Sequence, residues 1–169
     1  MSRRKRERKG MVLRLQRRAA TLISTCLGLG YSPKAPGTAG SLGALAAGVV
    51  LAHYRGWGRL EFALLSGAAL LPGIWAAGVE SAGAGEEDPS RIVVDEAIGQ
   101  WVAMAGITAH NWKSWLAALV LFRLFDIFKP PPIRQAERLH GGVGIVADDV
   151  AAGLAAGLVL FAAGCFNLY

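Results

Sequence analysis

Five apolar runs, separated by short charged segments, constrain how this chain can fold more than any other feature. They span residues 42–54, 60–79, 97–110, 115–128 and 150–169, and the charged residues lie almost entirely between them. Hydrophobic residues make up 53% of the 169-residue chain and the mean hydropathy is +0.38, which exceeds what a soluble domain of this length needs for its core. The surplus of apolar residues predicts contact with lipid.

The lengths of these runs indicate membrane-crossing helices. Runs 60–79 and 150–169 reach the roughly 20 residues needed to cross about 30 Å of hydrocarbon. The three shorter runs are compatible with short or tilted spans, re-entrant segments or buried core helices. We therefore expect an all-α fold: a compact, polytopic helical membrane domain with four to five spans, formed by residues 19–169.

A basic arm, residues 1–18, precedes this domain and holds nine of the 18 lysine and arginine residues. Because the rest of the chain has no basic face, the net charge of +6 does not indicate nucleic-acid binding. A polybasic arm beside a span is typical of contact with anionic lipid and of an orientation signal, with a solvated tail as the alternative. The apolar stretch 19–30 lacks a clear signal-peptide cleavage site, and we expect it to be retained.

The basic residues also predict which side of the membrane each loop faces. With the amino terminus inside, 15 basic residues lie on the cytoplasmic side and three, Arg55, Arg59 and Lys113, lie outside. This orientation brings the charged segments 31–41, 80–96 and 123–149 to the cytoplasmic face. Three charged loops on one face are what an enzyme acting on lipid head groups needs.

The first of these segments is rich in small residues and begins an apolar helix. Thr38 or Ser41 is expected to cap that helix, which would leave backbone N–H groups available to phosphate oxygens, with Lys34 nearby. The P-loop spacing is absent, and a simple capped turn is the alternative explanation.

Five carboxylates are expected at the same face. Two adjacent pairs, Asp95 with Glu96 and Asp148 with Asp149, begin apolar runs, and Asp126 lies within one. Helix capping explains one such pair, but five carboxylates at one face repel one another unless a cation lies among them. Oxygen ligands without a cysteine or histidine cluster favour a hard ion, and Mg²⁺ is the predicted metal.

The segment around Asp126 combines this carboxylate with two cations. Arg123, Asp126 and Lys129 recur every three residues and share one side of a helix. An ionisable residue at membrane depth is costly and indicates a functional site, with an ion pair inside the helix as the alternative. The prolines from Pro130 onward are expected to end this helix.

Four segments in order resemble the signature blocks of the phosphatidylglycerophosphatase A family: YSPKAPGTAGS, VVDEAIG, FRLFDIFKPPPI and GGVGIVADDVAAG. The resemblance covers residues 28–159. It implies a Mg²⁺-dependent phosphatase of the bacterial inner membrane, with its active site facing the cytoplasm. Such an enzyme would remove the terminal phosphate of phosphatidylglycerophosphate to give phosphatidylglycerol and inorganic phosphate.

The residues are consistent with metal-assisted attack of water on the phosphate. The predicted metal ligands are Asp95, Glu96, Asp126, Asp148 and Asp149, of which Glu96, Asp126 and Asp149 are also expected to be catalytic. The predicted phosphate ligands are Lys129, Arg123, Lys34, Thr38 and Ser41.

Two other classes of protein compete with this interpretation. Another enzyme of phospholipid head-group phosphotransfer, such as a CDP-alcohol phosphotransferase, would share the substrate class and metal, but its spaced aspartate pattern is absent. A small transporter subunit would also place carboxylates in a membrane. Such a protein should show internal repeats or ionisable residues near mid-span, and neither is visible in this sequence.

Overall fold

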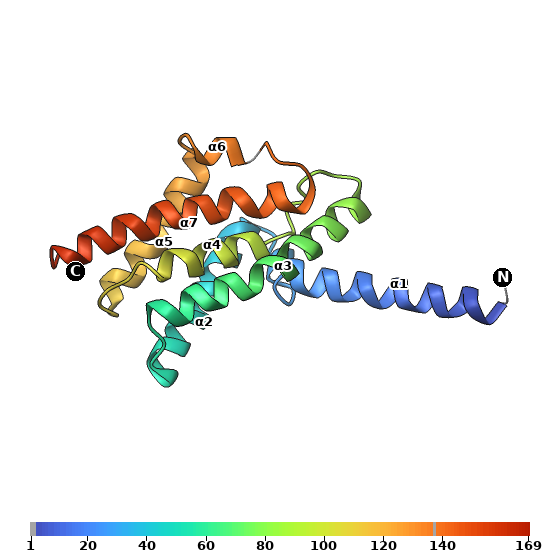
Figure 1. The fold of residues 1–169 in the computed structure, drawn as a ribbon, viewed down its shortest axis with the longest axis horizontal. Coiled ribbons are helices and arrows are strands. Elements are labelled where there is room, and N and C mark those ends of the chain that lie inside the picture. Colours follow the sequence, from blue (N-terminus) through green and yellow to red (C-terminus); the bar gives the residue numbers. More distant parts are fainter. Residues whose placement is uncertain (1–2, 137) are drawn as a thin grey trace.

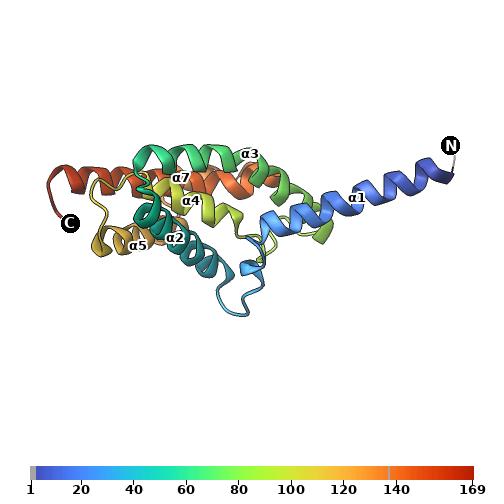
Figure 2. The ribbon, with the colours of Figure 1, turned by 90° about the horizontal axis from the view of Figure 1, so that it is seen from below.

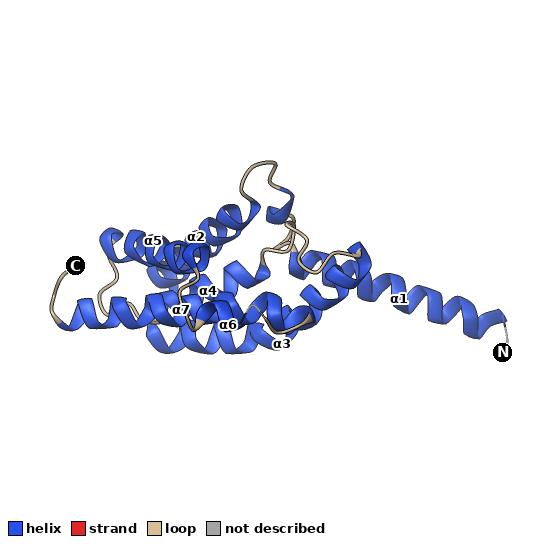
Figure 3. Cartoon of the chain, turned by 90° about the horizontal axis from the view of Figure 1, so that it is seen from above, coloured by secondary structure: helices blue, strands red, loops and turns tan. Residues whose placement is uncertain are grey.

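The computed structural model describes residues 3–136 and 138–169, without the side chains of residues 3–7 and 9. This part of the chain is helical and contains no strand, which confirms the all-α prediction (Figure 3). The elements are α1 (Arg3–Ser24), the short 3₁₀ helix η1 (Leu29–Tyr31), α2 (Pro36–Arg55), α3 (Arg59–Ala84), α4 (Val94–Met104), α5 (Trp112–Phe128), α6 (Ile133–Ala136) and α7 (Gly141–Cys165).

Two helices in the described part of the chain, α3 and α7, are long and apolar enough to cross a membrane. Only 28% of the most apolar 18-residue stretch of α3 is buried inside the protein, so most of its apolar surface is exposed. The run 97–110 does not form such a helix, because α4 has 11 residues and a length of about 16 Å at 1.5 Å per residue. Four to five spans therefore remain a prediction.

α4 is the central helix and contacts α2, α3, α5 and α7. Its closest approach is to α7, where glycines on both helices remove the side chains that would separate them. A Cβ added to Gly99 would lie 2.6 Å from the carbonyl oxygen of Asp149, and one added to Gly153 would clash with the carbonyl of Gly99. This close packing brings the Asp149 backbone directly against α4.

α1 projects from the bundle, and only its carboxyl-terminal part packs on other helices (Figures 1 and 2). The contact is partly apolar, since Ala20 is buried and Ile23 packs on the core. It is also partly polar: the Thr21 hydroxyl donates to Glu80 Oε2 of α3 at 2.7 Å, and Arg91 Nε pairs with Glu80 Oε1 at 2.6 Å. α1 continues without interruption through positions 18 and 19, where the basic arm was expected to meet the folded domain. The same helix thus carries the basic residues and anchors them to the bundle.

Two helix starts differ from the sequence prediction. α2 is not capped by Thr38 or Ser41: its N-cap is Ala35, Pro36 occupies the first turn, and the Ser41 hydroxyl donates to the Gly37 carbonyl instead. Proline suits this first turn because its missing N–H has no helical acceptor there.

α7 begins at Gly141, so Asp148 lies about two turns inside the helix and not at its start. The glycine-rich segment before the aspartates is helical and packs closely on its neighbours. A Cβ at Gly142 would clash with the Ile74 carbonyl of α3. Helix capping therefore does not explain the Asp148–Asp149 pair.

Candidate active site

Three carboxylates from two helices form a compact cluster. Asp95 and Glu96 lie in the first turn of α4, and Asp149 faces them from α7. One oxygen from each of these three residues lies within 4.8 Å of the other two. The sequence separates Asp149 from the other two residues by more than 50 positions, and the glycine contact between α4 and α7 brings them together.

α5 contributes an acid and a base to the edge of this cluster. Arg123 Nη1 lies 2.6 Å from Asp126 Oδ2 and 3.8 Å from Glu96 Oε1. Asp126 also lies close enough to Asp149 for their negative charges to repel each other. The ion pair inside α5, proposed from the sequence as an alternative, is therefore present, and it also borders the carboxylate cluster.

The cluster is largely buried, and Arg123 compensates its negative charge only in part. Asp95 and Asp149 are 7% and 3% exposed, and one oxygen in each of Asp95, Glu96 and Asp149 has no hydrogen-bond partner among the described residues. Burial raises the pKa of Asp95 well above its ordinary value, and the charges of Glu96 and Asp149 raise it further. Burial likewise raises the pKa of Glu96.

These properties fit a bound cation. Buried, partnerless carboxylate oxygens are costly, and a cation would satisfy them and relieve their mutual repulsion. The three residues Asp95, Glu96 and Asp149 offer only oxygen, the ligand that hard divalent ions prefer. Asp126 lies beside this group and can contribute to it, whereas the Asp148 carboxylate pairs elsewhere.

The amino terminus of α2 closes another side of the cluster. A Cβ at Gly37 would clash with Glu96 Oε1 and would lie 3.4 Å from Arg123 Nη1, so the first turn of α2 contacts both groups. Only glycine permits this approach, and it presents the amino-terminal end of the helix dipole to the site. Thr38 lies in this turn, Ser41 is buried one turn further, and Lys34 is exposed in the preceding loop.

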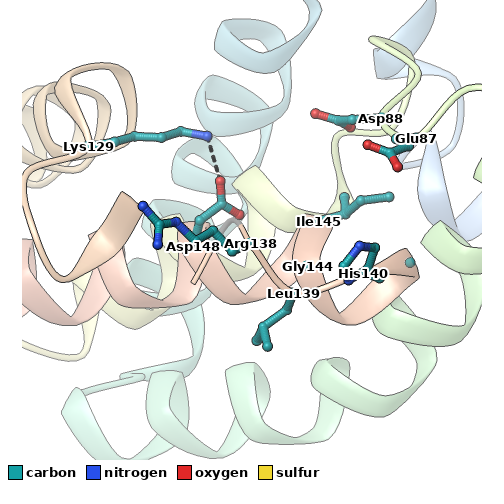
Figure 4. A pocket seen from close by; sticks show the side chains of 10 residues that line it. Glu87, Asp88, Lys129, Arg138, Leu139, His140, Gly144, Ile145 and Asp148 are labelled. Atoms are coloured by element: carbon teal, nitrogen blue, oxygen red, sulfur yellow. Dashed lines mark hydrogen bonds and ion pairs between the residues drawn. The ribbon is translucent and has the colours of Figure 1, made fainter. Parts of the chain in front are cut away.

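Asp148 points into an adjoining pocket of about 410 Å³ (Figure 4). Its Oδ2 atom pairs with Lys129 Nζ at 2.6 Å, so Lys129 contacts Asp148 and not Asp126. Arg138 and His140 line the same pocket, and Glu87 and Asp88 lie across it from Lys129. Asp148 precedes Asp149 in α7, but none of the three clustered carboxylates lines this mixed-charge pocket.

Several of these residues escaped the sequence prediction. Arg138, Glu87 and Asp88 lie in connecting segments without a recognisable motif, and only folding places them on one pocket. Gln100 is fully buried, with neither side-chain polar atom partnered in the described structure. The sequence could have indicated Gln100 as a neighbour of the site, because it follows Glu96 by four residues and residues four apart share a helix face.

Cys26 is not suited to act as a nucleophile in this region. Burial raises the pKa of its thiol to about 11, with a smaller contribution from the charge of Glu96. The reactive thiolate is therefore scarce at neutral pH.

Known proteins with similar sequences show the family to which the chain is related. The sequence model of a family described as Phosphatidylglycerophosphatase A matches residues 22–164. A Bacteroides thetaiotaomicron protein named "Putative phosphatidylinositol-3-phosphatase" is 44% identical over 142 residues, covering 79% of this chain and 86% of the relative.

Two further relatives are both named Phosphatidylglycerophosphatase A. The Escherichia coli protein is 34% identical over 83% of this chain and 81% of its own length, and the Haemophilus influenzae protein is 39% identical over 83% and 86%. No solved structure matches the chain. The matched range includes all three clustered carboxylates, Arg123 and Lys129, and the chain belongs to the phosphatidylglycerophosphatase A family of lipid phosphatases.

Proposed function

We propose that this protein is a Mg²⁺-dependent phosphatase that hydrolyses the terminal phosphate of phosphatidylglycerophosphate, giving phosphatidylglycerol and inorganic phosphate. The observation that carries the proposal is the buried, oxygen-only group of Asp95, Glu96 and Asp149. The neighbouring residue in α7, Asp148, lines a pocket that also contains the cations Lys129 and Arg138. This arrangement suits a phosphomonoester, which needs both a divalent ion and positively charged side chains.

The carboxylates have distinct roles in this proposal. Asp95, Glu96 and Asp149 hold Mg²⁺, with Asp126 next to them and Asp148 at the pocket edge. Bound Mg²⁺ supplies charge neutralisation at the phosphate and activation of water. Glu96, Asp126 and Asp149 are the candidate catalytic carboxylates, one of which accepts the proton of the attacking water.

Cationic groups on the substrate side complete the site. Four carboxylates with one Mg²⁺ and Arg123 retain net negative charge, which repels a phosphomonoester. Lys129 follows the last residue of α5 and lines the pocket. We therefore assign its ammonium group to a phosphate oxygen of the substrate, which would replace part of its ion pair with Asp148. Arg123, Lys34 and the first turn of α2, which includes Thr38, are the other candidate phosphate ligands, and Ser41 supports that turn through its bond to Gly37.

The proposed location is the bacterial inner membrane, with several crossings and with the site facing the cytoplasm. Exposed apolar side chains on α2, α3, α5 and α7 support lipid contact, including Leu42, Leu71, Val120 and Leu158. The unequal distribution of basic residues supports the orientation.

The test is release of inorganic phosphate by the purified protein in detergent. We expect hydrolysis of phosphatidylglycerophosphate with Mg²⁺ and its loss in a chelator, restored by adding Mg²⁺ back. Phosphatidylinositol 3-phosphate is assayed in parallel, because one relative carries a name for that substrate. Preferential hydrolysis of the inositol lipid would refute the substrate assignment but not the chemistry, and no release from either lipid would refute the function.

A further inference from the structure

An apolar groove of about 450 Å³ lies on the other side of α4 from the carboxylate cluster. Its walls come from the end of α1, the following loop, α2, α3 and α4, and its lining includes no charged side chain. The indole N–H of Trp101 in this wall already donates to the Ala44 carbonyl at 3.0 Å. The groove therefore suits an apolar ligand, and its volume is typical of small-molecule pockets, at roughly 300–1,000 Å³.

The groove and the carboxylate cluster share helix α4. Val94, Ala97 and Trp101 line the groove from α4 at the spacing of one helix face, whereas Asp95 and Glu96 between them face the cluster. One turn of a helix rises about 5.4 Å, so the near end of the groove lies within about one turn of the carboxylates along α4.

Helix α2 also contacts the carboxylate cluster with one part and the groove with another. Its first turn contacts Glu96 through Gly37, and the following turns line the groove through Gly43 and Ala47. These small residues leave space between α2 and the Ala69 wall of α3. The groove thus lies between two helices that also expose Leu42 and Leu71. These exposed apolar residues belong to the surface that we assigned to lipid contact.

We propose that this groove holds an acyl chain of the lipid substrate while its phosphate lies at the carboxylate cluster. The inference rests on the proposed lipid phosphatase function and adds a site that selects the substrate by its chain. An acyl chain is the occupant because the groove is apolar, opens among lipid-facing side chains and begins within one helical turn of the head-group site. A polar head group alone would leave it empty.

A groove-filling variant tests the role of the groove in substrate selection. Ala47 is exposed at the groove, so Ala47→Phe adds a ring there, and Ala69→Phe fills it from the α3 wall. Ala46→Phe is the matched control, since Ala46 is exposed on the same helix and does not line the groove.

We expect the two groove variants to raise KM for long-chain phosphatidylglycerophosphate at least tenfold, equivalent to about 1.4 kcal/mol. Hydrolysis of glycerol 3-phosphate, which has the phosphomonoester without chains, should be the same in all variants. Equal KM values for Ala47→Phe, Ala69→Phe and Ala46→Phe on the long-chain lipid would overturn the proposal.

Fluorescence provides a readout that needs no turnover. The other four tryptophans are changed to phenylalanine, leaving Trp101 as the reporter of the groove. In micelles, a phosphomonoester lipid with brominated chains should quench Trp101 at lower concentration than the same brominated lipid without the phosphate. Ala47→Phe should abolish this difference, and Ala46→Phe should retain it.

The outcomes separate the two proposals. Quenching that depends on the phosphate and is lost in Ala47→Phe supports the groove even if the chosen lipid is not hydrolysed, in which case the proposed function alone fails. If the lipid is hydrolysed but both brominated lipids quench Trp101 equally, the proposal that the groove holds an acyl chain of the substrate is overturned. A dimer that dissociates in Ala47→Phe but not in Ala46→Phe would assign the groove to a second copy of the chain and also overturn the proposal.

Discussion

Replacing Asp95 by asparagine should stabilise the metal-free protein while removing its response to Mg²⁺. Asp95 is 7% exposed, and its carboxylate lies in a cluster with Glu96 and Asp149 whose ligand oxygens are within 4.8 Å of one another. Asparagine keeps nearly the same shape and removes the charge. Its amide can also donate to the two remaining carboxylates, which have oxygens without hydrogen-bond partners in the described structure.

The size of the effect follows from the geometry. Two unit charges no more than 4.8 Å apart repel by at least about 3.5 kcal/mol at an effective dielectric constant of about 20, so a charged Asp95 experiences at least about 7 kcal/mol from two charged neighbours. The metal-free protein can avoid this repulsion by protonating one carboxyl group. Protonating an ordinary aspartate at pH 7 costs about 4 kcal/mol, so the repulsion can destabilise the folded protein by no more than about this amount. We therefore expect Asp95→Asn to raise the unfolding free energy without metal by about 2–4 kcal/mol and Tm by about 5–15 °C.

Thermal unfolding in detergent, followed by tryptophan fluorescence, measures this directly. With chelator, the Tm of Asp95→Asn should exceed that of the wild type, and added Mg²⁺ should raise only the wild-type Tm appreciably. A variant that is less stable than the wild type in chelator would refute the argument, because it would show that Asp95 is compensated within the protein. Glu86→Gln is a suitable control, since Glu86 is exposed in the loop before α4.

The pH dependence of this stability provides an independent check. The folded-state pKa of Asp95 is raised, chiefly by burial, above its unfolded value. Its favourable contribution is therefore complete below the unfolded pKa and is lost as pH rises through the folded pKa. In chelator the wild type should lose stability as pH rises above about 4, and Asp95→Asn should lose less; equal slopes would contradict this.

The other predictions concern the phosphate, the metal and the topology. Lys129→Met should lower kcat/KM for the lipid by about 10² or more with little change in Mg²⁺ affinity; weakened Mg²⁺ binding with near-normal kcat at saturating metal would show that Lys129 only supports Asp148. Asp149→Asn should reduce turnover by about 10³ or more, in a protein that remains folded by circular dichroism, and most activity remaining would move the site elsewhere. Single cysteines at Ser90 and Gln135, in a cysteine-free background, should be protected from an impermeant thiol reagent in intact cells; labelling without lysis would reverse the proposed topology.

Much of the candidate site was predictable because its residues are unusual where they occur. Charged side chains in or beside apolar helices are costly, so Asp95, Glu96, Asp126 and Asp149 stood out without structural information. The pairing of Lys129 was not predictable, because sequence spacing favours Asp126 three residues away. In the folded protein Asp148 of α7 lies 2.6 Å from Lys129, since α5 and α7 pack together at that level.

The lengths of the helical runs were also only partly informative. The apolar runs predicted helices, and the run 97–110 was compatible with a short span or with a buried core helix; its first part belongs to α4, a short buried helix. An apolar run of this length cannot distinguish these outcomes, since both need an apolar surface. The contacts of α4 with the helices around it decided the result.

The sequence alone determined the helical class, the excess of apolar surface, the family resemblance and which residue types carry charge, because these are properties of local composition and order. Only the tertiary structure determined which charges meet. Glycine contacts between α4 and α7 bring Asp149 to Asp95 and Glu96, and Gly37 brings the first turn of α2 to the same point. Such contacts depend on the close approach of segments that are far apart in the chain. A glycine in the sequence shows that another helix can pack closely there, but it does not show which helix does so.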